Sequence, residues 1–147
     1  MRRAFIDANI LVAVLNKEYP LFRSAARLLS LASNPSFSLY TSPICLAIAF
    51  YFAEKKSGTS EALRKISTLV EHIKVLDCGN KEVAAALVNK QVLDFEDGLQ
   101  YYAAIHGDCE VIVTENGNDF HFSKIPVMTS EDHLRQVALP FIKTKAK

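Results

Sequence analysis

Residues 4–11, Ala4-Phe5-Ile6-Asp7-Ala8-Asn9-Ile10-Leu11, decide the fold because one aspartate joins an apolar strand to a helix. Residues 3–6 are predicted to form a buried strand, and the apolar positions after Asp7 recur at helical spacing. An unpaired charge among core residues is costly. A site at the carboxyl end of the strand explains the carboxylate, because open α/β sheets bind their ligands at that edge.

Short apolar strands alternate with helices along the rest of the chain. Further strands are expected at residues 37–40, 73–76, 111–113 and 125–128. Helices are expected at residues 8–16, 20–32, 42–56, 60–71, 80–90 and 94–106, with a last helix that Ser130 caps. This alternation predicts an α/β fold with a parallel sheet covered by helices on both faces.

Length and composition fit one domain with a sizeable core. Half of the 147 residues are hydrophobic, and a net charge of +1 is no global signature of nucleic-acid binding. We expect a single domain over residues 1–140 and a basic, disordered tail over residues 141–147. The three cysteines are predicted to be free thiols. No apolar run reaches the ~18 residues of a membrane span, so a cytoplasmic location is expected.

Two later acidic segments are candidate partners of Asp7. Asp94-Phe95-Glu96-Asp97-Gly98 begins a predicted helix, and Thr114-Glu115-Asn116-Gly117-Asn118-Asp119-Phe120 follows a predicted strand. Each cluster alone also fits an ordinary role as a helix cap or a turn. Glu96 is expected to be a solvated helix charge. All three clusters fall at the sheet edge that should bear a site, and this joint placement favours a shared pocket.

Clustered carboxylates of this kind suit a divalent metal ion. Mg²⁺ or Mn²⁺ prefers oxygen ligands and binds through a few carboxylates together with substrate phosphate. Without a cation, such carboxylates repel one another and some take up protons. The pattern therefore predicts a Mg²⁺ or Mn²⁺ site suited to hydrolysis of a phosphodiester, in which the metal polarises the phosphoryl oxygens and activates a water.

The ordered segments at residues 5–11, 94–99 and 113–120 resemble the PIN domain family, the nucleases that include VapC toxins of bacterial toxin–antitoxin pairs. The resemblance runs from about residue 3 to residue 137. It implies a doubly wound parallel sheet of about five strands flanked by helices. It also implies Mg²⁺- or Mn²⁺-dependent cleavage of single-stranded RNA and a small antitoxin protein as partner. The apolar helices at 20–32 and 60–71 are candidates for a homodimer contact.

The resemblance assigns roles residue by residue. The expected catalytic and metal-binding acids are Asp7, Asp97 and Asp119. The residues expected to support the cofactor are Asn9, Thr114 and Asn116. The Thr114 hydroxyl would orient the last polar group or a metal-bound water. Either Asn116 or Asp119 supplies that last group, and the sequence leaves this choice open.

One position departs from the family pattern. The family usually places a glutamate early in the helix after the second strand, and Ile48 stands in that place. Glu54 is the only acid on that helix, and its helical phase turns it away from this face. Two hypotheses follow. The chain is either a metal-dependent endoribonuclease weakened by Ile48, the toxin of a toxin–antitoxin pair, or an inactive PIN domain that binds RNA or a protein. A phosphatase-like hydrolase is disfavoured, because Asn9 takes the second place of an Asp-x-Asp motif.

Other side chains invite a nucleic-acid interpretation. Four basic residues either border a nucleic-acid groove or belong to a solvated helix end, and the second interpretation is favoured: Lys55, Lys56, Arg64 and Lys65. The aromatic run at residues 50–52 suggests base stacking, but helical aromatics of this kind are more often core.

Overall fold

A five-stranded parallel sheet forms the centre of the computed structural model, which describes residues 2–146. The strands are β1 (Arg2–Ile6), β2 (Phe37–Thr41), β3 (Lys74–Val75), β4 (Val111–Val113) and β5 (Val127–Met128). They lie in the order β3-β2-β1-β4-β5, and every neighbouring pair is parallel. The expected α/β class is confirmed, and each strand predicted from an apolar run is present.

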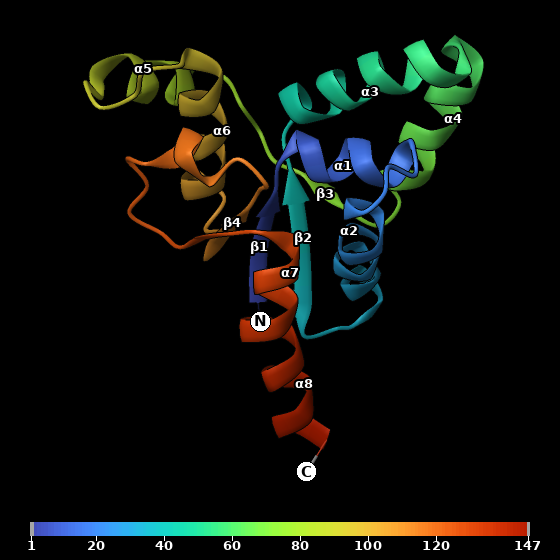
Figure 1. The fold of residues 1–147 in the computed structure, drawn as a ribbon. Coiled ribbons are helices and arrows are strands. Elements are labelled where there is room, and N and C mark those ends of the chain that lie inside the picture. The colour runs from blue at the N-terminus through green and yellow to red at the C-terminus, as the bar shows by residue number, and fades with distance from the viewer. Residues whose placement is uncertain (1, 147) are drawn as a thin grey trace.

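Helices flank this sheet (Figure 1). They are α1 (Ala8–Leu15), α2 (Leu21–Ser30), α3 (Pro43–Ser57), α4 (Thr59–Leu69), α5 (Asn80–Val88), α6 (Phe95–His106), α7 (Ser130–His133) and α8 (Leu139–Ala146). Short helical turns are η1 (Leu31–Ser33), η2 (Gly117–Phe120) and η3 (Leu134–Ala138). Helix α1 packs on α3, α3 on α4 and α5 on α6. Within residues 2–146, no helix has the length and apolarity needed to cross a bilayer.

Strand β1 is the middle strand and sets the position of Asp7. Phe5 and Ile6 are fully buried, and Ile6 is in register with Val113 of β4. The β-branched residues of β4 suit this buried position. The Asp7 backbone N–H donates to the Val113 carbonyl oxygen at 3.0 Å. Pairing therefore continues past the end of β1 and fixes Asp7 at the carboxyl edge of the sheet.

Side-chain caps fix where α3 and α7 begin. Ser42 Oγ accepts a hydrogen bond from the Cys45 N–H at 3.1 Å, which is the ordinary geometry of a serine cap. At α7 the prediction was wrong by one residue, because Thr129 Oγ1 accepts from the Asp132 N–H at 3.1 Å and Ser130 is already helical. Threonine and serine both cap helices, so the sequence alone does not distinguish the two positions.

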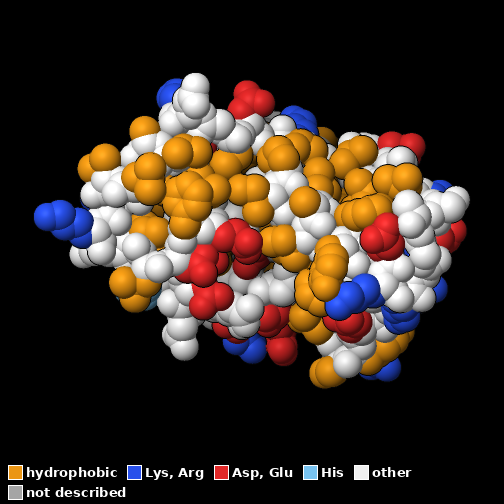
Figure 2. Space-filling model, turned by 90° about the horizontal axis from the view of Figure 1, so that it is seen from above, with side chains coloured by type: hydrophobic (Ala, Val, Ile, Leu, Met, Phe, Trp, Pro, Cys, Tyr) orange, Lys and Arg blue, Asp and Glu red, His pale blue; other side chains and the backbone are white. Residues whose placement is uncertain are grey.

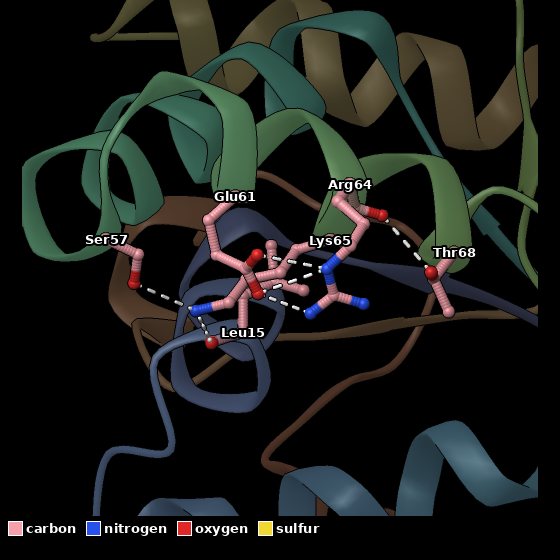
Figure 3. Close-up of polar contacts among 6 residues, drawn as sticks. All are labelled: Leu15, Ser57, Glu61, Arg64, Lys65 and Thr68. Carbon is pink, nitrogen blue, oxygen red and sulfur yellow. Dashed lines mark hydrogen bonds and ion pairs between the residues drawn. The ribbon is translucent and has the colours of Figure 1, made fainter.

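The basic residues of α4 make contacts within the molecule. Lys65 Nζ donates to the Leu15 carbonyl oxygen at 2.9 Å and to Ser57 Oγ at 3.1 Å (Figure 3). Arg64 Nε donates to both carboxylate oxygens of Glu61 at 3.1 Å. A cation beside the last carbonyls of α1 also opposes the negative end of that helix. Lys65 therefore joins α4 to α1 and α3, which neither interpretation from the sequence included. Arg64 pairs within α4 on its exposed surface, in agreement with the favoured interpretation of a solvated helix end.

The carboxyl-terminal segment is helical up to Ala146. A basic, disordered tail was expected over residues 141–147, but α8 covers residues 139–146. The Phe141 ring lies 5.5 Å from the Phe37 ring, measured between centroids, at an edge-to-face angle. Through this contact the segment packs on Phe37 of β2. The lysine-rich composition of the segment does not indicate such packing. Lys147 lies outside the described residues.

Candidate functional site

The carboxyl ends of β1 and β4 open onto a pocket of about 410 Å³. The predicted site residues that line it are Asp7, Asn9, Asp97, Asn116 and Asp119. Figure 2, seen from above the strand ends, shows acidic side chains gathered near the middle of this face and bordered by hydrophobic ones. The fold therefore brings together three clusters that are far apart in the sequence.

Both oxygens of the Asp7 carboxylate are held by the protein. Oδ1 accepts from the Ala8 N–H at 2.7 Å, so Asp7 is also the cap of α1. Oδ2 accepts from the Thr114 hydroxyl at 2.7 Å. The Cys45 thiol lies 3.8 Å from Oδ1, and burial followed by the Asp7 charge raises the pKa of this thiol to about 12. Cys45 therefore remains protonated and donates. A carboxylate has about four lone pairs, so Asp7 keeps acceptor capacity toward the pocket.

Thr114 connects the ends of β1 and β4. It is the one predicted site residue that does not line the pocket, because its side chain is fully buried. Its hydroxyl donates to Asp7 and accepts from Asn9 Nδ2 at 3.0 Å and from the Asn116 N–H at 3.1 Å. Asn9 Oδ1 in turn accepts from the Glu115 N–H at 3.3 Å. Thr114 therefore orients Asp7 directly and acts on the pocket only through its neighbours.

The start of α6 places Asp97 over the strand ends. Asp94 caps this helix, since its Oδ1 accepts from the Asp97 N–H at 3.2 Å. The capping interpretation of Asp94 is therefore confirmed, while Asp97 faces the pocket. Gly98 lets α6 approach its neighbour closely, because a Cβ there would lie 2.6 Å from a methyl of Val92 and 3.1 Å from Ala86. Glycine at this position supports the placement of the adjacent aspartate.

Asp119 and Asn116 stand at the exposed rim of the pocket. They belong to the loop after β4 and its turn η2, where Phe120 is 2% exposed and anchors the segment in the core. Both side chains line the pocket, so the structure does not select between Asn116 and Asp119 as the last polar group of the site.

The wall contributed by α3 is apolar. Ile48 and Phe52 line the pocket on this side. Phe52 and Tyr51 are 45% and 51% exposed, so the expectation that the aromatic run is core was wrong for these two. Glu54 accepts from the Thr59 hydroxyl at 2.8 Å at the far end of the helix. Among the described residues, α3 supplies no carboxylate to the lining.

Glu96 is a site residue that sequence reasoning missed. It is exposed, as expected, and it also lines the pocket together with Ile48. Burial, then the charges of Asp94 and Asp7, raise its pKa above 4.5. Its place next to Asp97 at a helix start was the available signal, but the first turn of a helix commonly carries solvated acids.

Burial and mutual repulsion disfavour ionisation of the pocket acids. Desolvation raises the pKa of Asp7 above 3.8, and the hydrogen bond from Thr114 opposes the shift in part. For Asp97, burial is the largest cause, followed by the charges of Asp94 and Asp119, and the pKa rises to about 7. A bound cation would favour the ionised forms. The crowding of these carboxylates therefore fits a positively charged occupant.

Replacing Asp97 with asparagine should stabilise the metal-free protein more at about pH 8 than at about pH 5. The folded pKa of about 7 exceeds the unfolded value of 3.8, so stability is lost as the pH rises through this window and the loss is complete above pH 7. Asparagine cannot ionise, so it removes the free-energy cost of a charged Asp97 in the folded protein. Thermal unfolding in EDTA should show a Tm gain of about 3 °C at the higher pH. Equal Tm gains at both pH values would contradict a raised pKa.

The donor set fits a hard divalent cation in its chemistry. Carboxylate and amide oxygens line the pocket, and Mg²⁺ keeps several waters and needs only one or two carboxylates. Within the part of the chain that the structure describes, no three acidic, histidine or cysteine side chains are gathered closely enough to hold an ion. An ion would be held here if Asp7 after β1, Asp97 of α6 and Asp119 of η2 drew closer together.

Comparison with known proteins shows the family to which the chain belongs. A model of the PIN domain matches residues 3–118. No curated protein matches the chain. Three solved structures illustrate the shared fold. VapBC2 from Rickettsia felis, bound to a DNA fragment from its promoter, is 20% identical with a TM-score of 0.65 and covers 86% of this chain and 96% of its own.

The other two structures agree with this fold. VapBC-1 from nontypeable Haemophilus influenzae is 21% identical with a TM-score of 0.66, covering 88% of this chain and 98% of its own. VapC20 from Mycobacterium tuberculosis, a sarcin–ricin loop cleaving toxin, is 16% identical with a TM-score of 0.59. The match covers 74% of this chain and 86% of VapC20. The family model spans most of the chain, from residue 3 to residue 118. The chain belongs to the PIN domain family.

Proposed function

We propose that this protein is a metal-dependent endoribonuclease of PIN type that cleaves single-stranded RNA with Mg²⁺ or Mn²⁺. The observation that carries the proposal is the convergence of Asp7, Asp97 and Asp119 in one pocket at the carboxyl edge of the sheet. Burial, and after it the charges of neighbouring acids, raises the pKa of Asp97 and Asp7, which favours a cationic cofactor. The name of VapC20, a sarcin–ricin loop cleaving toxin, supports RNA as the substrate class.

In this proposal Asp7, Asp97 and Asp119 hold the cation, with Asn9 and Asn116 beside them. When bound, the cation supplies Lewis acidity toward the phosphoryl oxygens and lowers the pKa of a bound water. The chain itself provides orientation. Thr114 fixes the Asp7 carboxylate, and Ile48 and Phe52 supply an apolar wall on the α3 side.

The proposed biological role is that of the toxin in a toxin–antitoxin pair in the cytoplasm. Two of the similar structures are VapBC proteins, which supports a small antitoxin protein as partner. A homodimer is proposed as well, with the apolar faces of α2 and α4 as the candidate contact. Co-expression with an antitoxin should relieve growth inhibition by this chain if the proposed role is right.

Removal of divalent metal should abolish RNA cleavage. With a single-stranded RNA substrate, we expect activity in Mn²⁺ and at least an about 100-fold loss in EDTA, because the metal supplies charge stabilisation that the acids cannot. Readdition of Mn²⁺ should restore the rate. Equal rates in EDTA and in Mn²⁺ would rule out the proposed mechanism.

A second candidate function is an inactive PIN domain that binds RNA or a protein. Ile48 favours it, because the position where the family expects a glutamate lines the pocket with an apolar side chain. This candidate predicts no turnover with any divalent metal while RNA binding is retained. Parallel binding and cleavage assays on the same RNA separate the two functions.

A further inference from the structure

Gln100 has a buried amide oxygen without a partner. The residue is 2% exposed, and Oε1 has no hydrogen-bond partner among the described residues. Buried polar groups in proteins are nearly always hydrogen-bonded, and an unpaired one lowers stability. A side chain of this kind calls for an explanation.

The amide of Gln100 belongs to the acidic pocket. It lies three residues after Asp97 on α6, so the two side chains share one face of the helix. Gln100 lines the pocket together with Asp97 and Asp7. When Asp7 and Asp97 are ionised, as they would be around a cation, they only accept hydrogen bonds and cannot satisfy an amide oxygen. An occupant that brings a positive charge or a hydrogen-bond donor to this side of the pocket would supply the missing partner.

We propose that Gln100 is a binding residue for the occupant of this pocket, and that its Oε1 contacts the divalent cation or a water bound to it. The inference rests on the proposed function and adds a ligand to it. An amide oxygen suits Mg²⁺ and Mn²⁺ as a ligand and adds no charge to a crowded set of carboxylates. Gln100 on α6 faces the same pocket as Ile48 on α3, where the expected carboxylate is missing, and partly compensates for it.

The test compares Mn²⁺ binding by Gln100→Leu, Asp7→Asn and wild type, measured by titration calorimetry without RNA. Leucine has a similar volume and removes the polar atoms. We expect an about 10-fold weaker Mn²⁺ affinity for Gln100→Leu. Its Tm in EDTA should be unchanged or raised, since an unpaired buried oxygen is removed. Gln100→Glu, which restores an oxygen, should keep Mn²⁺ affinity near wild type, and the exposed Gln136→Leu is the matched control.

The outcomes separate the two levels of the proposal. Wild-type Mn²⁺ affinity in Gln100→Leu, with binding lost in Asp7→Asn, overturns the role of Gln100 and leaves the metal site intact. A wild type that binds no Mn²⁺ overturns both. Equal destabilisation of Gln100→Leu with and without Mn²⁺ would assign Gln100 a purely structural role. If leucine prevents folding, Gln100→Met is judged by the same binding criterion.

Discussion

Replacing Asp7 with asparagine is expected to lower RNA cleavage by at least about 1000-fold and to weaken Mn²⁺ binding strongly, because the central ligand loses its charge. The fold should survive. Asparagine has a similar shape, its carbonyl oxygen still accepts from the Ala8 N–H, and the change removes a charge that burial disfavours. Single-turnover cleavage, Mn²⁺ titration and thermal unfolding measure the three effects on one preparation.

The matched control is Asp132→Asn, which makes the same chemical change on α7. Asp132 pairs with Arg135 and is not among the residues that line the pocket. Its cleavage rate and Mn²⁺ affinity should stay within about twofold of wild type, since surface pairs of this kind contribute little. If Asp7→Asn behaves like this control, the assignment of the site is wrong.

The overall fold could be predicted because its determinants are local and periodic. Apolar runs such as residues 4–6 and 111–113 have the length and branching of buried strands, and the helices between them force parallel pairing. Parallel strands then bring their carboxyl ends to one edge. This geometry predicts Asp7, Asp97 and Asp119 in one pocket, and all three side chains line it.

What the sequence did not reveal depends on contacts between distant segments. Glu96 and Gln100 have the appearance of ordinary helix residues, and only the approach of α6 to the end of β1 gives them a shared pocket. The role of Cys45 as a donor to Asp7 also depends on such a contact, because the two residues are far apart in the sequence. Thr129 and Ser130 could each cap α7, and only the folded structure shows that Thr129 does so. The contact of Phe141 with Phe37 likewise depends on where the fold places the two rings.

The substitution Ile48→Glu should raise Mn²⁺ affinity by about 10-fold and increase the rate of RNA cleavage. Ile48 lines the pocket that Asp7, Asp97 and Glu96 line, so a carboxylate there adds an oxygen ligand to a cation that binds through few of them. Titration calorimetry and cleavage assays at limiting Mn²⁺ give the two measurements.

The same substitution should destabilise the protein in EDTA, because another negative charge joins carboxylates that already raise one another's pKa. Mn²⁺ should then raise the Tm of Ile48→Glu more than that of wild type. Glutamine has nearly the same shape as glutamate and carries no charge. Ile48→Gln should therefore show neither the loss of stability in EDTA nor the full gain in Mn²⁺ affinity. Unchanged Mn²⁺ affinity in Ile48→Glu would mean that this position is not the place of the family glutamate. In that case Ile48 and Phe52 would form a wall of the pocket that does not take the place of a metal ligand.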